Sequence, residues 1–131
     1  MNTALWLVQA FLGISFTLAG LRKIIEDHTR LGPQLPWTTR FHPAVVKGIG
    51  VLELLAGLGF IIPRLAGIAP TLTPLTAIAV GVAMVFALIH HLRYKEGREA
   101  IVNVVVLVLA SFIAIFRNEG NIVGEQAIVL L

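Results

Sequence analysis

Four long apolar blocks, separated by short polar segments, dominate the pattern along the chain. They cover about residues 3–21, 44–62, 68–90 and 99–116, and the first contains no charged residue. Each is close to the roughly 20 residues that a helix needs to cross the hydrocarbon core of a bilayer. The pattern predicts an all-α fold, an integral membrane bundle of four helices.

The residues at the block ends set the expected limits of the helices. Arg22 and Lys23 follow the first block, whereas a cleaved signal peptide carries its positive charge before a shorter apolar region, so we expect a retained helix. We expect Pro63 to stop the second helix. Residues 117–131 are polar and then end in a short apolar run, so we interpret them as a C-terminal tail on a single domain, 1–131.

Composition supports a lipid environment and excludes several kinds of chemistry. The mean hydropathy is +0.90 and only 13% of residues are charged, against about 25% in soluble domains. The chain has no cysteine, which excludes disulfides, thiolate metal sites and a cysteine nucleophile. Despite a pI near 10.0, the basic residues lie beside apolar blocks and suit anionic lipid headgroups, so we expect no nucleic acid partner.

The basic residues also predict an orientation. Lys and Arg concentrate in the first and third loops, and cytoplasmic loops carry such an excess. We therefore place these two loops in the cytoplasm and both termini outside, an asymmetry that argues against a dual-topology dimer. The eight residues on the cytoplasmic side are Arg22, Lys23, Arg30, Arg40, Lys47, Arg93, Lys95 and Arg98, and the two opposite are Arg64 and Arg117.

Each block carries small or polar residues at helical spacing, which predicts one inward stripe per helix. Small residues let membrane helices approach closely, so we assign Gly13, Gly20, Gly50 and Gly57 to helix packing. The predicted stripes are Gln9, Gly13, Phe16 or Thr17, and Gly20; Val46, Gly50, Glu53 and Gly57; Thr76, Ala79, Ala83, Ala87 and His90; and Asn103, Leu107, Ala110 and Ala114.

Glu53 lies at the centre of the second block. An acidic residue there costs about 2.5–3.5 kcal/mol, several times what one interhelical hydrogen bond returns. If both helices end at the same membrane surface, Glu53 lies near the midplane, on the order of 12 Å from the level of Arg22. We therefore expect no direct salt bridge to the basic pair, but a neutral acid hydrogen-bonded to Gln9, Asn103 or water.

His90 and His91 are adjacent, so on a helix their side chains point about 100° apart and do not serve one metal. No acidic or sulfur ligands accompany them. We expect His90 to pack inward, His91 to reach the membrane interface, and no metal site to form.

The first loop is the longest connection and contains Trp37 and Phe41. Aromatic residues gather at membrane interfaces, which favours a simple anchor. The functional alternative is a lid over a cavity facing the cytoplasm. The chain contains no phosphate loop, nucleophile elbow, HExxH or calcium-loop motif, so we predict no catalytic residue.

Several stretches, in this order, resemble the DoxX-like family of small membrane proteins: "FxxAGLRK" at the end of the first block, "PW" in the loop, "GVLELLAGLGFIIP", "GIAPTLTPLTAIAVGVAM" and "IVNVVVLVLA". The resemblance implies a four-helix bundle in a bacterial inner membrane. The family takes its name from a small subunit of a quinol-linked thiosulfate-oxidising complex, and other members are associated with membrane oxidoreductase assemblies. The features it carries over are Gly20, Lys23, Gly50, Glu53, His90 and Asn103.

Three functions fit these observations. The first is an accessory subunit that binds a quinone or similar lipophilic molecule, the second a small proton-coupled transporter, and the third a structural or assembly protein. In each the chain is not an enzyme on its own, and its expected partners are the lipid bilayer, membrane oxidoreductase subunits and further copies of itself. The candidate ligand residues are Glu53, His90, Asn103, Gln9, Lys23 and Trp37.

Overall fold

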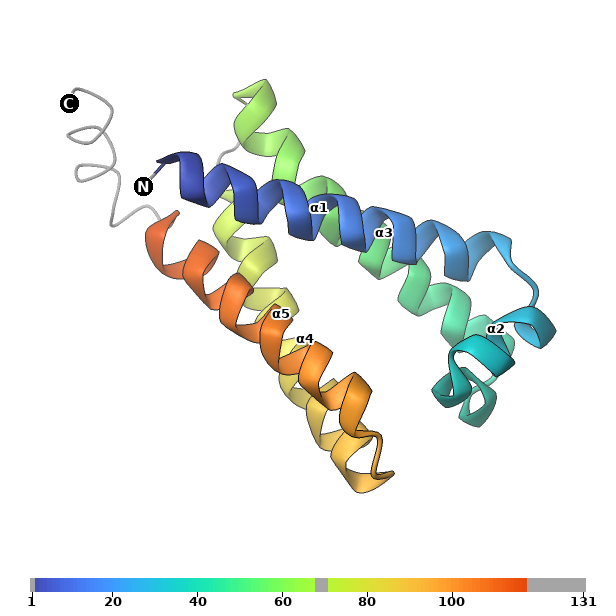
Figure 1. Cartoon of the computed structure of the whole chain (residues 1–131). Helices are drawn as coiled ribbons and strands as arrows, with labels where there is room; N and C mark the ends of the chain where they lie inside the picture. Colours follow the sequence, from blue (N-terminus) through green and yellow to red (C-terminus); the bar gives the residue numbers. More distant parts are fainter. Residues whose placement is uncertain (1, 68–70, 118–131) are drawn as a thin grey trace.

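The computed structural model describes residues 2–67 and 71–117, and all its regular elements in these ranges are helices. The all-α prediction is confirmed: four of them, α1, α3, α4 and α5, are long and apolar enough to cross a membrane. Two short segments, α2 and η1, connect α1 to α3 (Figure 1). The elements are α1 (Asn2–Ile25), α2 (His28–Gln34), η1 (Pro36–Arg40), α3 (Pro43–Ala66), α4 (Leu72–Arg93) and α5 (Gly97–Phe116).

The helix α3 does not stop at Pro63, so that prediction was wrong. Proline removes one backbone N–H, which leaves the carbonyl four residues earlier without its helical donor. The Thr73 hydroxyl of α4 donates to that carbonyl, Gly59 O, at 3.1 Å. The helix therefore continues to Ala66 and ends at Gly67, whose φ of 69° is the left-handed conformation that glycine adopts at helix ends.

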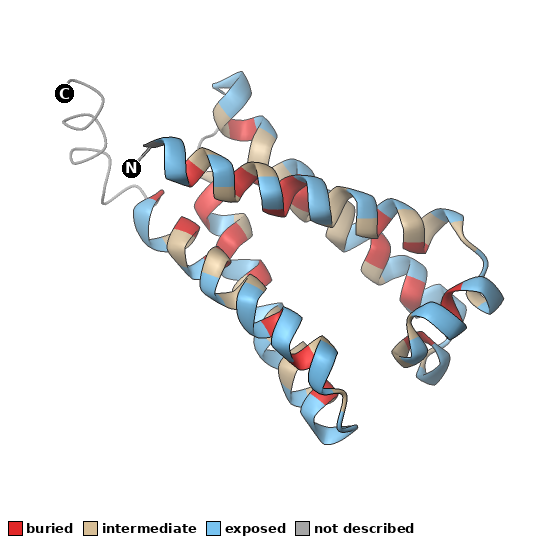
Figure 2. Cartoon of the chain, in the orientation of Figure 1, coloured by how far each residue is buried: buried red, intermediate tan, exposed pale blue. Residues whose placement is uncertain are grey.

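The four long helices form two pairs, α1 with α3 and α4 with α5. The pairs meet near the N-terminus and diverge toward the opposite end, where α2 and the α4–α5 connection lie (Figure 1). We call these the closed end and the open end. Figure 2 shows buried positions on the facing sides of the helices, and the core cluster consists of Leu5, Leu12, Phe60, Ala77, Val80, Ala110 and Ile113.

Glycine allows α1 and α3 to touch backbone to backbone. A Cβ built on Gly20 would lie 2.5 Å from Gly50 O and 2.6 Å from Leu54 N, and one on Gly57 would lie 2.6 Å from Thr17 N. Such separations exclude any side chain, as in other small-residue contacts between membrane helices. These contacts also fix the register, with residue 20 of α1 at the level of residues 50–54 of α3.

The inward face of α4 differs from the predicted stripe. Ala79 and Ala83 are exposed, whereas Thr73, Ala77, Val80 and His91 are buried. Alanine is small enough for a helix contact and apolar enough for lipid, so it does not distinguish the two environments. On α5 the expected stripe does face inward, with Asn103 and Ala110 buried.

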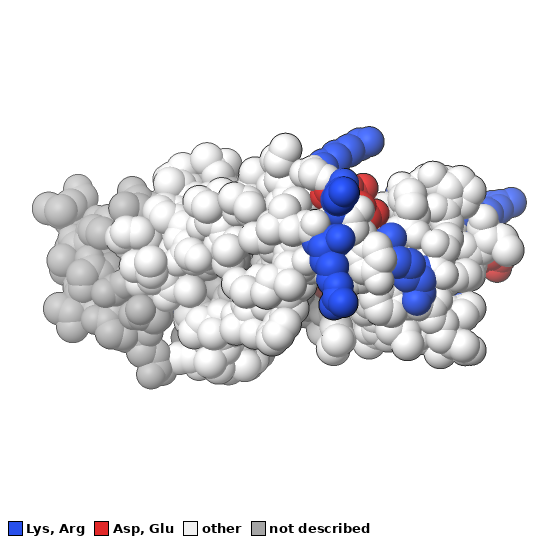
Figure 3. All heavy atoms as spheres, turned by 90° about the horizontal axis from the view of Figure 1, so that it is seen from below, with Lys and Arg blue, Asp and Glu red and all other residues white. Residues whose placement is uncertain are grey.

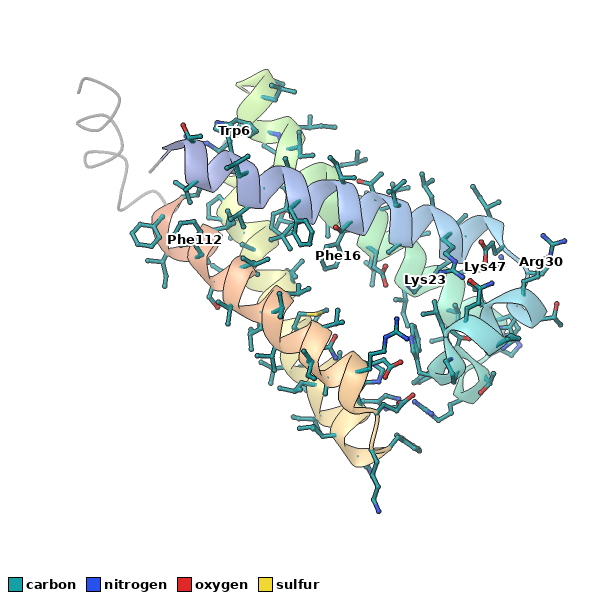
Figure 4. The ribbon with its side chains drawn as sticks, in the orientation of Figure 1. Trp6, Phe16, Lys23, Arg30, Lys47 and Phe112 are labelled. Atoms are coloured by element: carbon teal, nitrogen blue, oxygen red, sulfur yellow. The ribbon has the colours of Figure 1, made fainter. Side chains whose placement is uncertain are left out.

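Charged side chains gather toward the open end. In the view of Figure 3, Lys and Arg lie over the α4–α5 connection and the α2 region, and the white surface to the left of them shows no charged group. Figure 4 shows Lys23, Arg30 and Lys47 at this end, with Trp6 and Phe112 at the other. Most of the predicted tail, residues 118–131, lies outside the described residues.

Candidate functional site

Lys23 and Glu53 form an ion pair, with Nζ 3.0 Å from Oε2, at the junction of α1 and α3. The Lys23 side chain is 8% exposed and that of Glu53 is 19% exposed. Our prediction that no direct salt bridge forms was wrong. It assumed that α1 and α3 end at one level, whereas the glycine contacts place Lys23 and Ile24 of α1 beside Gly50, only three residues before Glu53. The 12 Å gap therefore does not exist.

The last turn of α1 is held by further basic residues. Lys47 of α3 donates from Nζ to Ile24 O at 2.8 Å, satisfying one of the carbonyls that a helix leaves free at its C-terminus. Arg22 pairs with Glu26 at 3.2 Å. Cations near a helix C-terminus are also favoured by its dipole, so this cluster stabilises the turn that carries Lys23.

Trp37 of η1 links this ion pair to α4. Its ring lies 5.8 Å from Lys23 Nζ on one side and meets His91 edge-on at 6.3 Å between centroids. A cation at such a distance from an indole is attracted by the ring. Trp37 therefore packs between α1 and α4 at the open end, where it adjoins the candidate residue Lys23 and also His91, which was not among the candidates.

The two histidines exchange the roles that we predicted. His91 is buried and its Nδ1 lies 3.1 Å from Glu96 Oε1, whereas His90 is only half-buried and packs on Tyr94 at 4.8 Å. The reason is the turn after α4, where Lys95 adopts a φ of 59°. This left-handed residue folds the chain back, and Glu96 comes to lie beside His91.

Glu96 is the centre of a cluster that the sequence analysis missed. It accepts hydrogen bonds from Arg40 of η1 and from His91, and Arg40 also lies over the Tyr94 ring at 4.1 Å. Burial alone would raise the pKa of Glu96, but these hydrogen bonds and positive charges outweigh it, so its pKa lies below the ordinary 4.5. Arg40 and Glu96 are distant in sequence and share no motif, so no pattern signalled this contact.

Asn103 and Gln9 have different surroundings. Asn103 is buried on α5, and its Nδ2 has no hydrogen-bond partner among the described residues. Gln9 bonds through both amide atoms at the closed end, because its Nε2 donates to Phe60 O at 2.7 Å and its Oε1 accepts from Arg117 Nε at 2.8 Å. Gln9 is thus bonded away from Glu53, and neither it nor Asn103 is the partner of that carboxyl group.

The open end therefore combines an ion pair, an indole, a buried imidazole and a buried amide donor. Within residues 2–67 and 71–117, no three His, Asp or Glu side chains are placed to hold a metal ion. Chemically, the arrangement suits a polar head that accepts hydrogen bonds, beside apolar helices that suit an aliphatic tail.

The family model of the DoxX-like family matches residues 7–113, which include most of α1 and α5 and all the helices between them. The chain belongs to the DoxX-like family. This DoxX-like chain matches no curated protein and no solved structure. With its four apolar helices, it is a multi-pass membrane protein, and the resemblance noted in the sequence is confirmed.

Proposed function

We propose that this DoxX-like protein binds a lipophilic molecule with a carbonyl-bearing head, such as a quinone, at the open end between its two helix pairs. The observation that carries the proposal is the unpartnered Nδ2 of Asn103. A buried donor without an acceptor costs about 1–3 kcal/mol, and native proteins rarely keep one without a reason. A quinone carbonyl would accept from this amide.

The surrounding residues supply the remainder of such a site. Phe16 of α1 and Met84 of α4 are partly buried and pack against the edge of the core cluster. An aromatic ring and a flexible thioether form an adaptable apolar wall for a planar head. About two turns along α1 from Phe16, Lys23 and its partner Glu53 place a cation and a carboxyl group 3.0 Å apart, able to bond a second polar group of the ligand.

In this proposal the chain holds the ligand and a partner carries out its chemistry. An associated membrane oxidoreductase is proposed as the source of the electrons. The excess of Lys and Arg at the open end orients that end toward the cytoplasm. The ligand head would then lie near the cytoplasmic surface, with its tail in the bilayer.

A structural role is the second candidate, and the Lys23–Glu53 pair itself favours it. The pair lies in the α1–α3 contact, next to the backbone contact of Gly20 with Gly50. In that role the pair fixes the register of two helices and no ligand is required. It predicts that replacing Asn103, which is outside this contact, changes no binding property.

Titration of the protein in lipid nanodiscs with decylubiquinone tests the proposal. A Trp6→Phe background leaves Trp37 as the single tryptophan, because the chain has two. We expect saturable quenching of Trp37 fluorescence and about a tenfold weaker dissociation constant in Asn103→Leu, the loss of one hydrogen bond of about 1.4 kcal/mol.

Ser111→Ala is the matched control, because Ser111 lies on the exposed side of the same helix and bonds only to Leu107 O at 2.8 Å. It should bind as the wild type does. Absence of saturable quenching, or equal affinities of Asn103→Leu and wild type, would refute ligand binding at this site.

A further inference from the structure

Residues 36–41, which comprise η1 and Phe41, lie between the two helix pairs at the open end, and we call them the lid. Their side chains contact the last turns of α4 and the turn that follows. Trp37 meets His91, and Phe41 meets His90 at 5.5 Å between ring centroids. Arg40 bonds to Glu96 and lies 3.1 Å from His90 Nε2. The lid thus joins the loop after α1 to the far helix pair.

The lid has little support of its own. The helices α2 and η1 have seven and five residues, and neither has a side-chain hydrogen bond at its N-terminal cap. Helices so short are marginal without tertiary contacts. The hydroxyl groups of Thr38 and Thr39 bond only to carbonyls three residues earlier within the same segment. The lid also packs on α2, where Thr38 is fully buried and Thr39 lies beside Gly32, so its contacts with α4 are what join it to the far helix pair.

One carboxyl group joins Arg40 of the lid to α4. Glu96 accepts from Arg40 on the lid and from His91 on α4, and we call these three residues the latch. The other charged or titratable groups nearby, His90 and Arg93 of α4, are basic when charged. Without the Glu96 charge, Arg40 would keep its contacts with the Tyr94 ring and with His90 Nε2 but would have no anion to pair with, so the lid would be held less tightly.

We propose that the lid is a gate over the Lys23–Glu53 site, held shut by the latch, and that release of Glu96 opens a path to that site for the ligand. The identity of the ligand that uses this path rests on the proposed function. Trp37 is the part of the lid that moves off the site, because its ring is the lid side chain beside Lys23. Gating differs from anchoring because it requires a lid that undocks while the helix pairs stay folded.

The fluorescence of Trp37 reports whether the lid is docked, and no ligand is needed for this measurement. In the Trp6→Phe protein in nanodiscs, we expect Glu96→Gln to raise the acrylamide quenching constant of Trp37 about threefold, with unchanged helical circular dichroism. Glu99→Gln is the matched control, since Glu99 lies in the first turn of α5 and takes no part in the latch. The exchange of charges in Arg40→Glu with Glu96→Arg should restore the low value. Equal quenching in Glu96→Gln and Glu99→Gln would overturn the gate.

A crosslink tests the path itself, because the natural chain has no cysteine to interfere. In Arg40→Cys with Glu96→Cys, a short bis-maleimide should tether the lid to the α4–α5 turn and slow decylubiquinone release at least tenfold relative to the unlinked protein. Release at an unchanged rate would overturn the gate. If wild type binds no decylubiquinone, the proposed function fails, and the acrylamide comparison alone decides the gate.

Discussion

A methyl group at Gly20 tests the contact that brings Lys23 to Glu53. The added Cβ of Gly20→Ala would lie 2.5 Å from Gly50 O, whereas ordinary contacts begin at 3.4 Å, so α1 and α3 must separate by about 1 Å. Overpacking of this kind costs about 1–3 kcal/mol. We expect the upper part of that range, because the obstacle is backbone and has no alternative rotamer.

Gly48→Ala is the matched control, because a Cβ on Gly48 meets nothing within 4 Å. There alanine should leave the free energy of unfolding unchanged or raise it by up to about 1 kcal/mol through its higher helix propensity. Unfolding by sodium dodecyl sulfate from mixed micelles, followed by circular dichroism, measures both variants under the same conditions.

The two variants should differ by about 2–4 kcal/mol. Equal unfolding free energies would show that Gly20 does not contact α3 as described. The register that pairs Lys23 with Glu53 would then be wrong, and the site would lose its basis.

Three further predictions concern other contacts. Glu53→Gln leaves the Lys23 ammonium unpaired and should lower the free energy of unfolding by about 3 kcal/mol in the same micelle assay. The double variant Lys23→Met with Glu53→Gln should recover part of this loss, and an equal loss in the single and double variants would contradict the ion pair. Because the folded pKa of Glu96 is lowered, the latch is lost as the pH falls through this lower value, so acrylamide quenching of Trp37 should rise below pH 4.5; a profile that does not rise there would contradict the latch. Thr73→Val should lower the free energy of unfolding by about 1 kcal/mol through loss of its hydrogen bond to Gly59 O. In a Pro63→Ala background the loss should be much smaller, because α3 regains its own N–H donor there, and equal losses in the two backgrounds would contradict the bond.

The sequence was sufficient for the four long helices, apart from the end of α3 beyond Pro63, and for the α1–α3 face, but it did not predict α2 and η1. Hydropathy and length predict membrane helices without knowledge of their neighbours, because each must satisfy its own backbone in lipid. The inward positions of α1 and α3 followed from glycine, whose missing side chain marks close contacts. The alanines of α4 carried no such information, and the predicted face there was wrong.

The partners of Glu53 and His91 depended on quantities that no local pattern contains. The first is the offset of α1 against α3, which the Gly20 contact determines. The second is the left-handed turn at Lys95, which returns Glu96 to His91. Residues with positive φ other than glycine are uncommon, so a sequence gives little warning of such a turn.

The carbonyl stretch of a bound quinone tests the central claim most directly, because it reports hydrogen bonding to the ligand head itself. Isotope-edited infrared spectra of decylubiquinone labelled with ¹³C at its carbonyl carbons can be compared in protein nanodiscs and in empty ones. We predict a stretch at lower frequency with the wild-type protein, and loss of that change in Asn103→Leu but not in Ser111→Ala. A carbonyl frequency identical to that in empty nanodiscs would contradict the assignment of Asn103 as the donor to the ligand.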